Sequence, residues 1–324
     1  MIPIERVKLI VNKYENLEKE LASGDIDKND LRKIVDYAKL QKEKRANLEK
    51  SAMDLEAPLA GKTLILIFEQ SSTRTRLSCE IAARQLGMHL LVLNPKESHL
   101  GTGDESIRDT CKVLNEYSDI VMMRTQKHSR LLEFAEHLDI PIINGLTGDG
   151  SHPTQVLGDV QSYEEVMGSI INQNISYLGD GSNNIACSLI HGSQKFGFNL
   201  RIACPKKFGP NKKVIKWAKS KKANILITKD PKEAVSESSC VYTDKWISMA
   251  DKLNKKKKKK LFKPYQVNKK IIKLAKKDAI FLHCLPRAEE VTDEVMYGKQ
   301  SVVWLQALNR IHIQKSIIEW CLNN

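Results

Sequence analysis

The stretch TLILIFEQSSTRTR (residues 63–76) joins an apolar run to a cluster of hydroxyl and guanidinium groups. Its first six residues, Thr63–Phe68, are typical of a buried strand. The apolar spacing in RLSCEIAARQLG, which begins at Arg76, predicts a helix that ends at Gly87. A strand that turns into a helix presents the first backbone N–H groups of that helix, which have no partner within it. Residues 71–76 therefore fit two structures equally well: a capped surface turn, or a cradle for an anion.

The side chains of SSTRTR (71–76) suit a phosphate group. Ser72, Thr73 and Thr75 can donate hydrogen bonds. Arg74 can bind a phosphate through two parallel N–H groups, and the helix N-terminus adds partial positive charge. The stretch has neither the GxxxxGK[ST] pattern of a Walker loop nor the GxGxxG pattern of a dinucleotide-binding loop. Arg76 either braces the turn or touches the ligand.

Eight further apolar runs alternate with helical segments, which is typical of βαβ units and of parallel sheets covered on both faces. We expect all nine runs to be buried strands bounded by turns. Four of the nine runs precede HPTQ (152–155) and five follow it. Nine strands are too many for one sheet, so the sequence predicts two α/β domains joined near residues 145–165. The final segment, residues 309–322, has helical periodicity and can dock on either domain. The eight further runs are 89–94, 119–124, 140–144, 175–180, 200–205, 224–228, 240–244 and 279–284.

Composition narrows the class of protein. With 324 residues, 41% of them hydrophobic and 28% charged, the chain can bury a core. No apolar stretch is long enough to cross a bilayer, and residues 1–20 lack a signal-peptide pattern, so we expect a mature N-terminus and a cytoplasmic protein. Seven scattered cysteines without a CxxC pair suggest reduced thiols instead of a disulfide framework or a structural zinc site.

The net charge of +13 raises the alternative of a nucleic-acid-binding protein. Apart from Lys255–Lys260, however, the lysines are spread along the chain, and no zinc-finger or aromatic-interleaved pattern accompanies them. We expect this six-lysine run to be a solvated, mobile loop, and the excess charge to steer a small anionic substrate. A non-catalytic nucleic-acid-binding protein is therefore the last-ranked alternative, and neither nucleic acid nor a membrane is an expected partner.

Polar clusters follow five of the predicted strands, at the edge where ligands bind in open parallel sheets. SSTRTR is the first of them, and Arg124 ends the strand at 119–124. GDGSNN (179–184) and Asp244 stand at the ends of two more strands. HCLPR (283–287) ends the last strand. Five clusters at strand exits are difficult to attribute to chance.

Two of the remaining motifs suit a small planar substrate and a zwitterion. In HPTQ, His152 and Gln155 lie one helical turn apart and so share a face, where they can bind a carbonyl oxygen and an NH2 group. Taken alone, HPTQ is more simply the capped start of a helix. Asp244 can bind an ammonium group while Ser248 and Met249 bind a carboxylate, although Asp244 can also be a helix N-cap.

Cys284 stands at the end of the last strand, beside a proline turn. A thiol there can be a nucleophile, but most cysteines are small buried apolar residues. His283 should point to the opposite strand face, so the sequence predicts no Cys–His pair. Covalent catalysis is therefore not the favoured mechanism.

The six motifs SSTRTR, HPTQ, GDGSNN, DKWISM (244–249), HCLPR and LNR (308–310), in this order and spacing, resemble those of the ornithine carbamoyltransferases. STRTR with HPxQ marks the wider carbamoyltransferase group, and HCLPR with DxxxSM points to the ornithine branch. The resemblance runs from about Gly61 to the C-terminus and is weaker over residues 1–60. It implies transfer of the carbamoyl group of carbamoyl phosphate to the δ-amine of L-ornithine, giving L-citrulline and phosphate, in arginine or urea-cycle metabolism. No cofactor, metal or covalent intermediate is implied.

The resemblance also implies an assembly of domains and subunits. A carbamoyl phosphate-binding domain would cover residues 1–150 and be completed by a C-terminal helix, 306–324, that packs back on it. An ornithine-binding domain would cover residues 151–305. The chain would form a homotrimer with active sites at subunit interfaces, and His99 would contact the phosphate bound by a neighbouring subunit.

The resemblance assigns roles to individual residues. Gln155 would hold the carbamoyl NH2 group, and Cys284 with Leu285 would line the junction between the two substrates. The implied catalytic residues are Arg124, His152, Cys284 and Arg310. The implied carbamoyl phosphate-binding residues are Ser72, Thr73, Arg74, Thr75, His99, Arg124, His152, Gln155, Cys284, Leu285 and Arg310. The implied ornithine-binding residues are Asn184, Asp244, Ser248 and Met249.

The chain departs from the family pattern at one glycine. SMG is usual in the family, but Ala250 replaces the glycine here, which puts ornithine affinity or loop closure in question if that position needs a positive φ. A carbamoyltransferase that acts on putrescine or on an acylated ornithine is the nearest alternative. Asp244 and Ser248, which suit free α-amino and carboxylate groups, argue against both of these acceptors.

Overall fold

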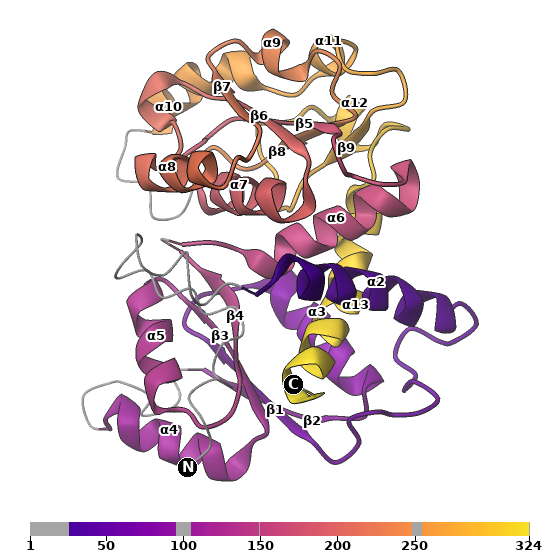
Figure 1. Cartoon of the computed structure of the whole chain (residues 1–324), viewed down its shortest axis with the longest axis vertical. Helices are drawn as coiled ribbons and strands as arrows, with labels where there is room; N and C mark the ends of the chain where they lie inside the picture. The colour runs from indigo at the N-terminus through magenta and orange to yellow at the C-terminus, as the bar shows by residue number, and fades with distance from the viewer. Residues whose placement is uncertain (1–25, 95–104, 149, 248–254, 324) are drawn as a thin grey trace. The chain divides into compact units, whose positions relative to one another are not determined.

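The computed structural model describes residues 26–94, 105–148, 150–247 and 255–323. The chain forms two compact units. Unit 1 combines residues up to Leu157 with those from Leu308 onward, and unit 2 spans Gly158–Ala307. Each unit contains an all-parallel sheet with helices on both faces (Figure 1), which confirms the predicted fold class.

The sheet of unit 1 has four strands in the order β2-β1-β3-β4. Successive side chains of a strand point to opposite faces, and Ile65 and Ile67 of β1 pack in one apolar cluster with residues of α4 and α5. On the other face, Sγ of Cys79 in α3 lies 3.1 Å from Sδ of Met122 in β3. The bounds are β1 Thr63–Phe68, β2 His89–Leu93, β3 Ile120–Thr125, β4 Ile142–Thr147, α3 Thr73–Gln85, α4 Ile107–Tyr117 and α5 His128–His137.

The turn from β1 into α3 follows the sequence prediction. Ser72 precedes the helix in an extended conformation, and its hydroxyl does not cap the helix. At the other end Gly87 adopts a φ of 81°, where a Cβ atom would lie 3.1 Å from the Cβ of Ala57. Only glycine adopts this conformation readily and also fits the space, so α3 ends before Gly87.

A β-bulge in β4 lies opposite the end of β3, where Arg124 stands. Met123 pairs with Asn144, but Arg124 pairs with Leu146, so one extra residue lies between them on β4. Leu146 has a φ of 138°, a strained value for leucine, and its N–H donates to Oδ1 of Asn144 at 2.9 Å. Bulges of this kind re-aim side chains next to functional sites.

The sheet of unit 2 has five strands in the order β7-β6-β5-β8-β9. An apolar cluster on one face joins Leu178 and Val241 of the sheet to Val235 of α9, Phe262 of α10 and Ile271 of α11. The strands are β5 Asn174–Leu178, β6 Asn199–Ala203, β7 Ile225–Thr228, β8 Cys240–Thr243 and β9 Ile280–Leu282. The helices are α6 Pro153–Met167, α7 Asn184–Phe196, η2 Lys206–Phe208, α8 Lys212–Ser220, α9 Pro231–Val235, α10 Lys255–Phe262, η3 Lys263–Tyr265, α11 Lys269–Ile272 and α12 Asp293–Met296.

Two sequence predictions are wrong in detail. All nine predicted strands form, but β2 and β7, each at one edge of its sheet, are not buried; Leu91 is 50% exposed and Ile227 42% exposed. The strands at the opposite edges, β4 and β9, are buried. The run Lys255–Lys260, predicted as a solvated loop, is helical and forms most of α10. One of its lysines, Lys258, is buried.

The C-terminal helix α13 (Val303–Asn323) packs against α2 (Lys28–Lys44) within unit 1, as expected for a helix that returns to the first domain. Buried polar contacts hold it there. Lys315 and Arg45 both pair with the Asp54 carboxylate, and Glu319 accepts a hydrogen bond from the Tyr37 hydroxyl at 2.9 Å. No helix within the described ranges is both long and apolar enough to span a bilayer.

Candidate active site

In unit 1 the predicted anion cradle forms at the N-terminus of α3. Ser72 and Arg74 are half-buried, Thr73 is exposed and Thr75 is buried. Because the Ser72 hydroxyl does not cap the helix, the first turn of α3 keeps backbone N–H donors for a ligand. Arg76 is different, since its Nε pairs with Oε1 of Glu80 at 2.7 Å on the exposed side of the helix. Arg76 therefore braces α3.

Thr75 lies between two guanidinium groups that come from distant parts of the chain. Its Oγ1 is 3.4 Å from Nη1 of Arg124, at the end of β3, and 3.4 Å from Nη2 of Arg310, in α13. Three separate elements thus bring positive charge and a hydroxyl to the carboxyl edge of the sheet. The structure confirms that Arg124, Thr75 and Arg310 lie together.

Arg310 also reaches the HPTQ motif at the start of α6. It donates from Nη1 to Oε1 of Gln155, and from Nη2 to Oγ1 of Thr154 at 3.3 Å. Nη1 lies 3.5 Å from Nε2 of His152. A guanidinium can only donate, so Nε2 accepts, and the proton of the neutral ring is on Nδ1, 3.3 Å from Oγ1 of Thr154. The predicted shared face of His152 and Gln155 is confirmed.

His152 is buried among these positive charges. Burial lowers the pKa of its imidazole well below the usual range, and three guanidinium groups lower it further, those of Arg310, Arg124 and Arg74. The ring is therefore neutral at physiological pH. The same potential that opposes a proton here favours an anion.

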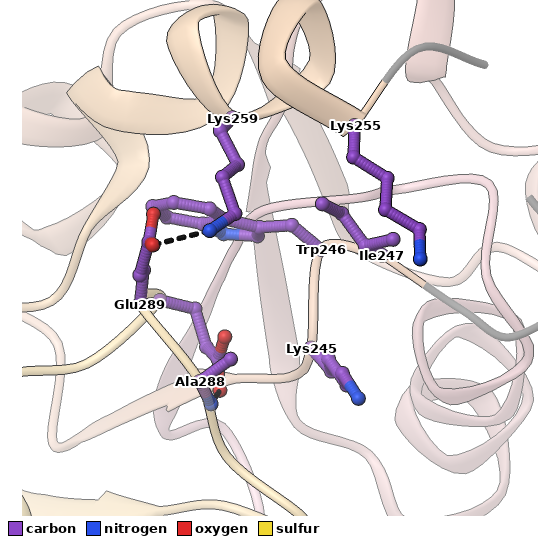
Figure 2. A pocket seen from close by; sticks show the side chains of 8 residues that line it. Lys245, Trp246, Ile247, Lys255, Lys259, Ala288 and Glu289 are labelled. Atoms are coloured by element: carbon purple, nitrogen blue, oxygen red, sulfur yellow. Dashed lines mark hydrogen bonds and ion pairs between the residues drawn. The ribbon is translucent and has the colours of Figure 1, made fainter.

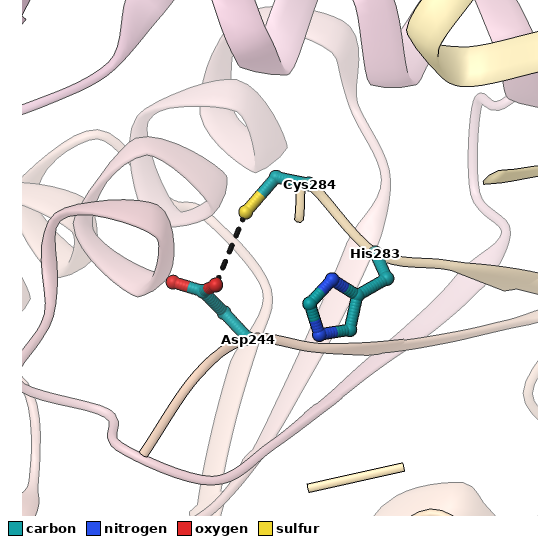
Figure 3. Close-up of side chains that lie close together, drawn as sticks. All are labelled: Asp244, His283 and Cys284. Atoms are coloured by element: carbon teal, nitrogen blue, oxygen red, sulfur yellow. Dashed lines mark hydrogen bonds between the residues drawn. The ribbon is translucent and has the colours of Figure 1, made fainter. Parts of the chain in front are cut away.

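In unit 2 the central group is the Asp244 carboxylate, which directly follows β8 and has partners on both oxygens. Figure 3 shows one of these partners, the Cys284 thiol. The Cys284 thiol donates to Oδ1 at 3.2 Å, and Nδ2 of Asn183 donates to Oδ2 at 3.2 Å. Burial nevertheless raises the pKa of Asp244, although His283 and Cys284 oppose the shift. A carboxylate that has lost much of its hydration gains from binding a cation.

HCLPR is ordered by a hydrogen-bonded histidine. The backbone N–H of Leu285 donates to Nδ1 of His283 at 2.8 Å, so Nε2 carries the ring proton and faces Oε1 of Glu290 at 3.1 Å. Leu285 itself has a φ of 58°, a conformation that costs free energy for leucine and is typical of functional sites.

The alternation rule predicted that His283 points to the opposite strand face from Cys284, and this prediction is wrong. The strand β9 ends at Leu282, so the alternation stops before His283. One donor atom from each of Asp244, His283 and Cys284 lies within 4.8 Å of the others (Figure 3). Both ring nitrogens of His283 already have partners, however, which leaves two donors where zinc in proteins takes three or four. That this site works without a metal stays a prediction.

Comparisons with known proteins agree with both halves of this geometry. A family model described as "Aspartate/ornithine carbamoyltransferase, carbamoyl-P binding domain" matches residues 20–165. A second, described as "Aspartate/ornithine carbamoyltransferase, Asp/Orn binding domain", matches residues 171–321. The chain belongs to the aspartate/ornithine carbamoyltransferase family.

Relatives within this family are similar along almost their whole length. The chain is 45% identical to the ornithine carbamoyltransferase of Nitrobacter winogradskyi over 300 residues, which cover 92% of this chain and 95% of the relative. It is 47% identical to that of Rhodopseudomonas palustris, with coverage of 92% and 94%. Among solved structures, ornithine carbamoyltransferase from Pyrococcus furiosus superposes with a TM-score of 0.84 at 39% identity, covering 92% of this chain and 95% of that one.

Some residues expected from carbamoyltransferases are not placed beside these groups. His99, Ser248 and Met249 lie outside the described residues. Asn184 is the half-buried first residue of α7, while the preceding Asn183 is the residue that contacts Asp244. The binding roles of these four predicted residues stay predictions.

Sequence reasoning missed two residues of the site. Thr154 contacts both Arg310 and His152, and Asn183 contacts Asp244. Both stand inside motifs that were singled out, HPTQ and GDGSNN, so their position was a usable signal. Their side chains were overlooked because a threonine and an asparagine at the start of a helix are ordinary capping residues.

We predict that the pKa of His152 in the folded, unliganded protein lies well below the usual histidine value of about 6.5, because burial and the nearby guanidinium groups oppose protonation of the ring. The folded pKa is below the unfolded value of about 6.5, so the stabilising effect of the neutral ring is present above about pH 6.5 and is lost as the pH falls. An NMR titration of protein labelled in its histidine rings measures this, with His152→Gln for assignment and the exposed His89 as a reference ring. A His152 titration midpoint at or above pH 6 contradicts the prediction.

Proposed function

We propose that this chain transfers the carbamoyl group of carbamoyl phosphate to the δ-amine of L-ornithine, giving L-citrulline and phosphate. The observation that carries the proposal is the cluster of guanidinium groups at the start of α3 and α6: Arg124 and Arg310 each lie 3.4 Å from Oγ1 of Thr75, and Arg310 lies 3.5 Å from Nε2 of His152. Such a site suits a phosphate dianion. Relatives named ornithine carbamoyltransferase over more than nine-tenths of the chain support the acceptor.

Unit 1 is the proposed carbamoyl phosphate-binding domain, completed by the end of α13, and unit 2 is the proposed ornithine-binding domain. The descriptions of the two family models support this division. Backbone N–H groups of α3, with the side chains from Ser72 to Thr75, hold the phosphate. Charge-assisted bonds from Arg74 and Arg124 strengthen its binding.

His152, Arg310 and Gln155 act on the carbamoyl group. Arg310 donates to the carbonyl oxygen, and Gln155 accepts from the NH2 group. For His152 to donate as well, its proton has to move to Nε2 while Nδ1 accepts from the Thr154 hydroxyl, which can either donate or accept. Donors that are already in place stabilise the oxyanion that forms on attack.

Asp244 binds the α-ammonium group of ornithine in this proposal. Burial already raises the pKa of its carboxyl, so a bound cation relieves an unfavourable charge. Asn183 and the Cys284 thiol hold the carboxylate in one orientation. Asn184, Ser248 and Met249 bind the rest of the amino acid, and Leu285 lines the reacting group.

The reaction itself needs the neutral form of the δ-amine, whose pKa in water is roughly 10. Nearby positive charge from the arginine groups favours loss of its proton. The lone pair then attacks the carbonyl carbon, the C–N bond forms, and the C–O bond to phosphate breaks with its electrons leaving on phosphate. The attacking nitrogen loses one proton, which the departing phosphate accepts. Cys284 forms no covalent bond in this sequence, because its thiol serves as a donor to Asp244.

We also propose a cytoplasmic homotrimer that acts in arginine or urea-cycle metabolism. The seven cysteines, all of them among the described residues, form no disulfide, which supports a reducing compartment. His99 would complete the phosphate site of a neighbouring subunit. The support for this role is the family resemblance of ESHLG (97–101).

Arg74→Ala should lower kcat/KM for carbamoyl phosphate by about 100-fold, because charge-assisted hydrogen bonds to phosphate contribute roughly 1.5–3 kcal/mol each. Arg76→Ala is the matched control, since Arg76 pairs with Glu80, and it should change kcat/KM by less than about threefold. Steady-state citrulline assays on both variants, with circular dichroism to verify folding, measure the difference. Equal values for the two variants would remove Arg74 from the phosphate site.

L-Ornithine should be the preferred acceptor by at least about 100-fold in kcat/KM over putrescine and over Nα-acetylornithine. Putrescine lacks the α-carboxylate and so leaves the groups that bind this carboxylate without a partner. Nα-Acetylornithine lacks the charge on the α-amino group and leaves the Asp244 carboxylate without its cation. Parallel assays at one saturating concentration of carbamoyl phosphate measure kcat/KM for the three acceptors and so determine which is preferred. A faster reaction with either analogue would overturn the choice of ornithine.

The assembled protein should have three times the 36.7 kDa mass of one chain. Sedimentation equilibrium measures this mass without reference to activity. A fully active protein that sediments as a single chain would exclude a site shared between subunits.

A further inference from the structure

One lysine of the run in α10 is unlike its neighbours. Lys258 is 5% exposed, and its ammonium group lies 2.8 Å from Oδ2 of the buried Asp180. The same group lies 5.0 Å from the ring centre of Phe208 and 5.5 Å from that of Phe262. The ion pair is thus desolvated and flanked by aromatic faces, where a charge interacts more strongly than at the surface.

Other lysines of α10 face outward. Lys255 and Lys259 line a pocket of about 230 Å³ beside Trp246, and Lys259 pairs with the exposed Glu289 across it (Figure 2). Successive residues of a helix are about 100° apart around its axis, so Lys258 projects from a different side than the adjacent Lys259, and Lys258 is buried whereas Lys259 is exposed. The run therefore contains one structural lysine among exposed ones.

The Asp180 carboxylate shapes the turn that follows β5. Its second oxygen, Oδ1, accepts from the Ser182 backbone N–H at 3.0 Å and from the Ser182 hydroxyl at 2.5 Å. The turn has little room to relax, because a Cβ atom on Gly181 would lie 2.9 Å from the carbonyl oxygen of Phe208. Lys258 thus fixes one oxygen of a carboxylate whose other oxygen orders residues 180–182.

The turn connects to Asp244 through a tyrosine and an asparagine. The Tyr177 hydroxyl donates to the carbonyl oxygen of Asp180 at 3.3 Å and accepts from Nδ2 of Asn183 at 2.8 Å. The same Nδ2 donates to Oδ2 of Asp244 at 3.2 Å, while Oδ1 of Asn183 caps α7 through the N–H of Ala186 at 2.8 Å. Both ends of the Asn183 amide are therefore engaged.

We propose that Lys258 is a positioning residue for the amino-acid substrate. It acts through Asp180, the turn and Asn183, which together set the orientation of the Asp244 carboxylate. Without Lys258, Asp180 is left as a buried negative charge and has to take up a proton or move, and the turn moves with it. The inference rests on the proposed role of Asp244 in binding ornithine and goes beyond it in assigning a function to the lysine run.

The test is Lys258→Met in the full chain, which keeps the length of the side chain and removes its charge. The KM for ornithine should rise at least tenfold, while the KM for carbamoyl phosphate changes less than twofold. Lys258→Arg should return the ornithine KM to within about threefold of wild type. Lys260→Met, at an exposed position of the same run, should leave both KM values unchanged. An unchanged ornithine KM, or an equal rise in both KM values, overturns the inference.

A second variant tests the inference in case Lys258→Met does not fold. Asp180→Asn combined with Lys258→Met removes both charges, so thermal unfolding should occur at a higher temperature than in Lys258→Met alone. The ornithine KM should return to within about threefold of wild type, because asparagine at position 180 keeps Oδ1 as the acceptor for Ser182 and leaves no buried charge. A double variant whose ornithine KM is as high as that of Lys258→Met overturns the inference.

Failure of the inference and failure of the proposed function are distinguishable. If the wild-type chain forms no citrulline, the proposed function fails. Hydrogen exchange of a peptide covering residues 177–187 then tests the inference directly: exchange should be at least tenfold faster in Lys258→Met than in Lys260→Met. Equal exchange in the two variants overturns the link between Lys258 and the turn.

Discussion

The rest of unit 1 depends on one constraint: several guanidinium groups lie around one buried imidazole, that of His152. Arg74, Arg124 and Arg310 come from a helix start, a strand end and the C-terminal helix. Like charges repel, so the fold has to hold each group by contacts elsewhere. The bulge opposite Arg124 and the contacts of Lys315 and Glu319 that anchor α13 serve this purpose. These contacts offset the repulsion between the arginines in the unliganded protein. An anion that neutralises the arginines removes this repulsion, which makes its binding free energy more favourable.

Unit 2 has to hold negative charge away from water, whereas unit 1 holds positive charge. Two carboxylates of unit 2, the buried Asp180 and the half-buried Asp244, would each be costly without a partner. Asp180 is neutralised permanently by Lys258, whereas Asp244 is held by the polar but uncharged donors Asn183 and Cys284. The first carboxylate is therefore structural, and the second keeps its need for a cation. One unit thus stores unmet positive charge and the other unmet negative charge, in accord with substrates of opposite sign.

Much of the fold was predictable, because apolar runs between turn residues specify buried parallel strands with little ambiguity. The exposure of β2 and β7 was not predictable, because the order of the strands decides which of them are edges and no local sequence pattern encodes this order. For the site, the position at a strand exit indicated Arg124, the helical spacing in HPTQ indicated His152 and Gln155, and only the resemblance to the carbamoyltransferases indicated Arg310. Pairings between distant residues, such as Lys258 with Asp180, were invisible because a lysine looks the same in a sequence whether solvated or buried.

The uniform composition of the lysine run has an evolutionary consequence. Lys258 and Phe262 share a face of α10 because they are four residues apart, and the two residues directly before Leu261 are also lysines. An inserted lysine anywhere in the run still leaves a lysine four positions before Phe262, and so does deletion of up to three lysines, because position 258 is the third lysine counted back from the end of the run. Changes in repeat length therefore leave the ion pair in register. A repetitive stretch, usually regarded as sequence of low information, thus keeps a lysine at the one buried position when the number of lysines changes by a few residues.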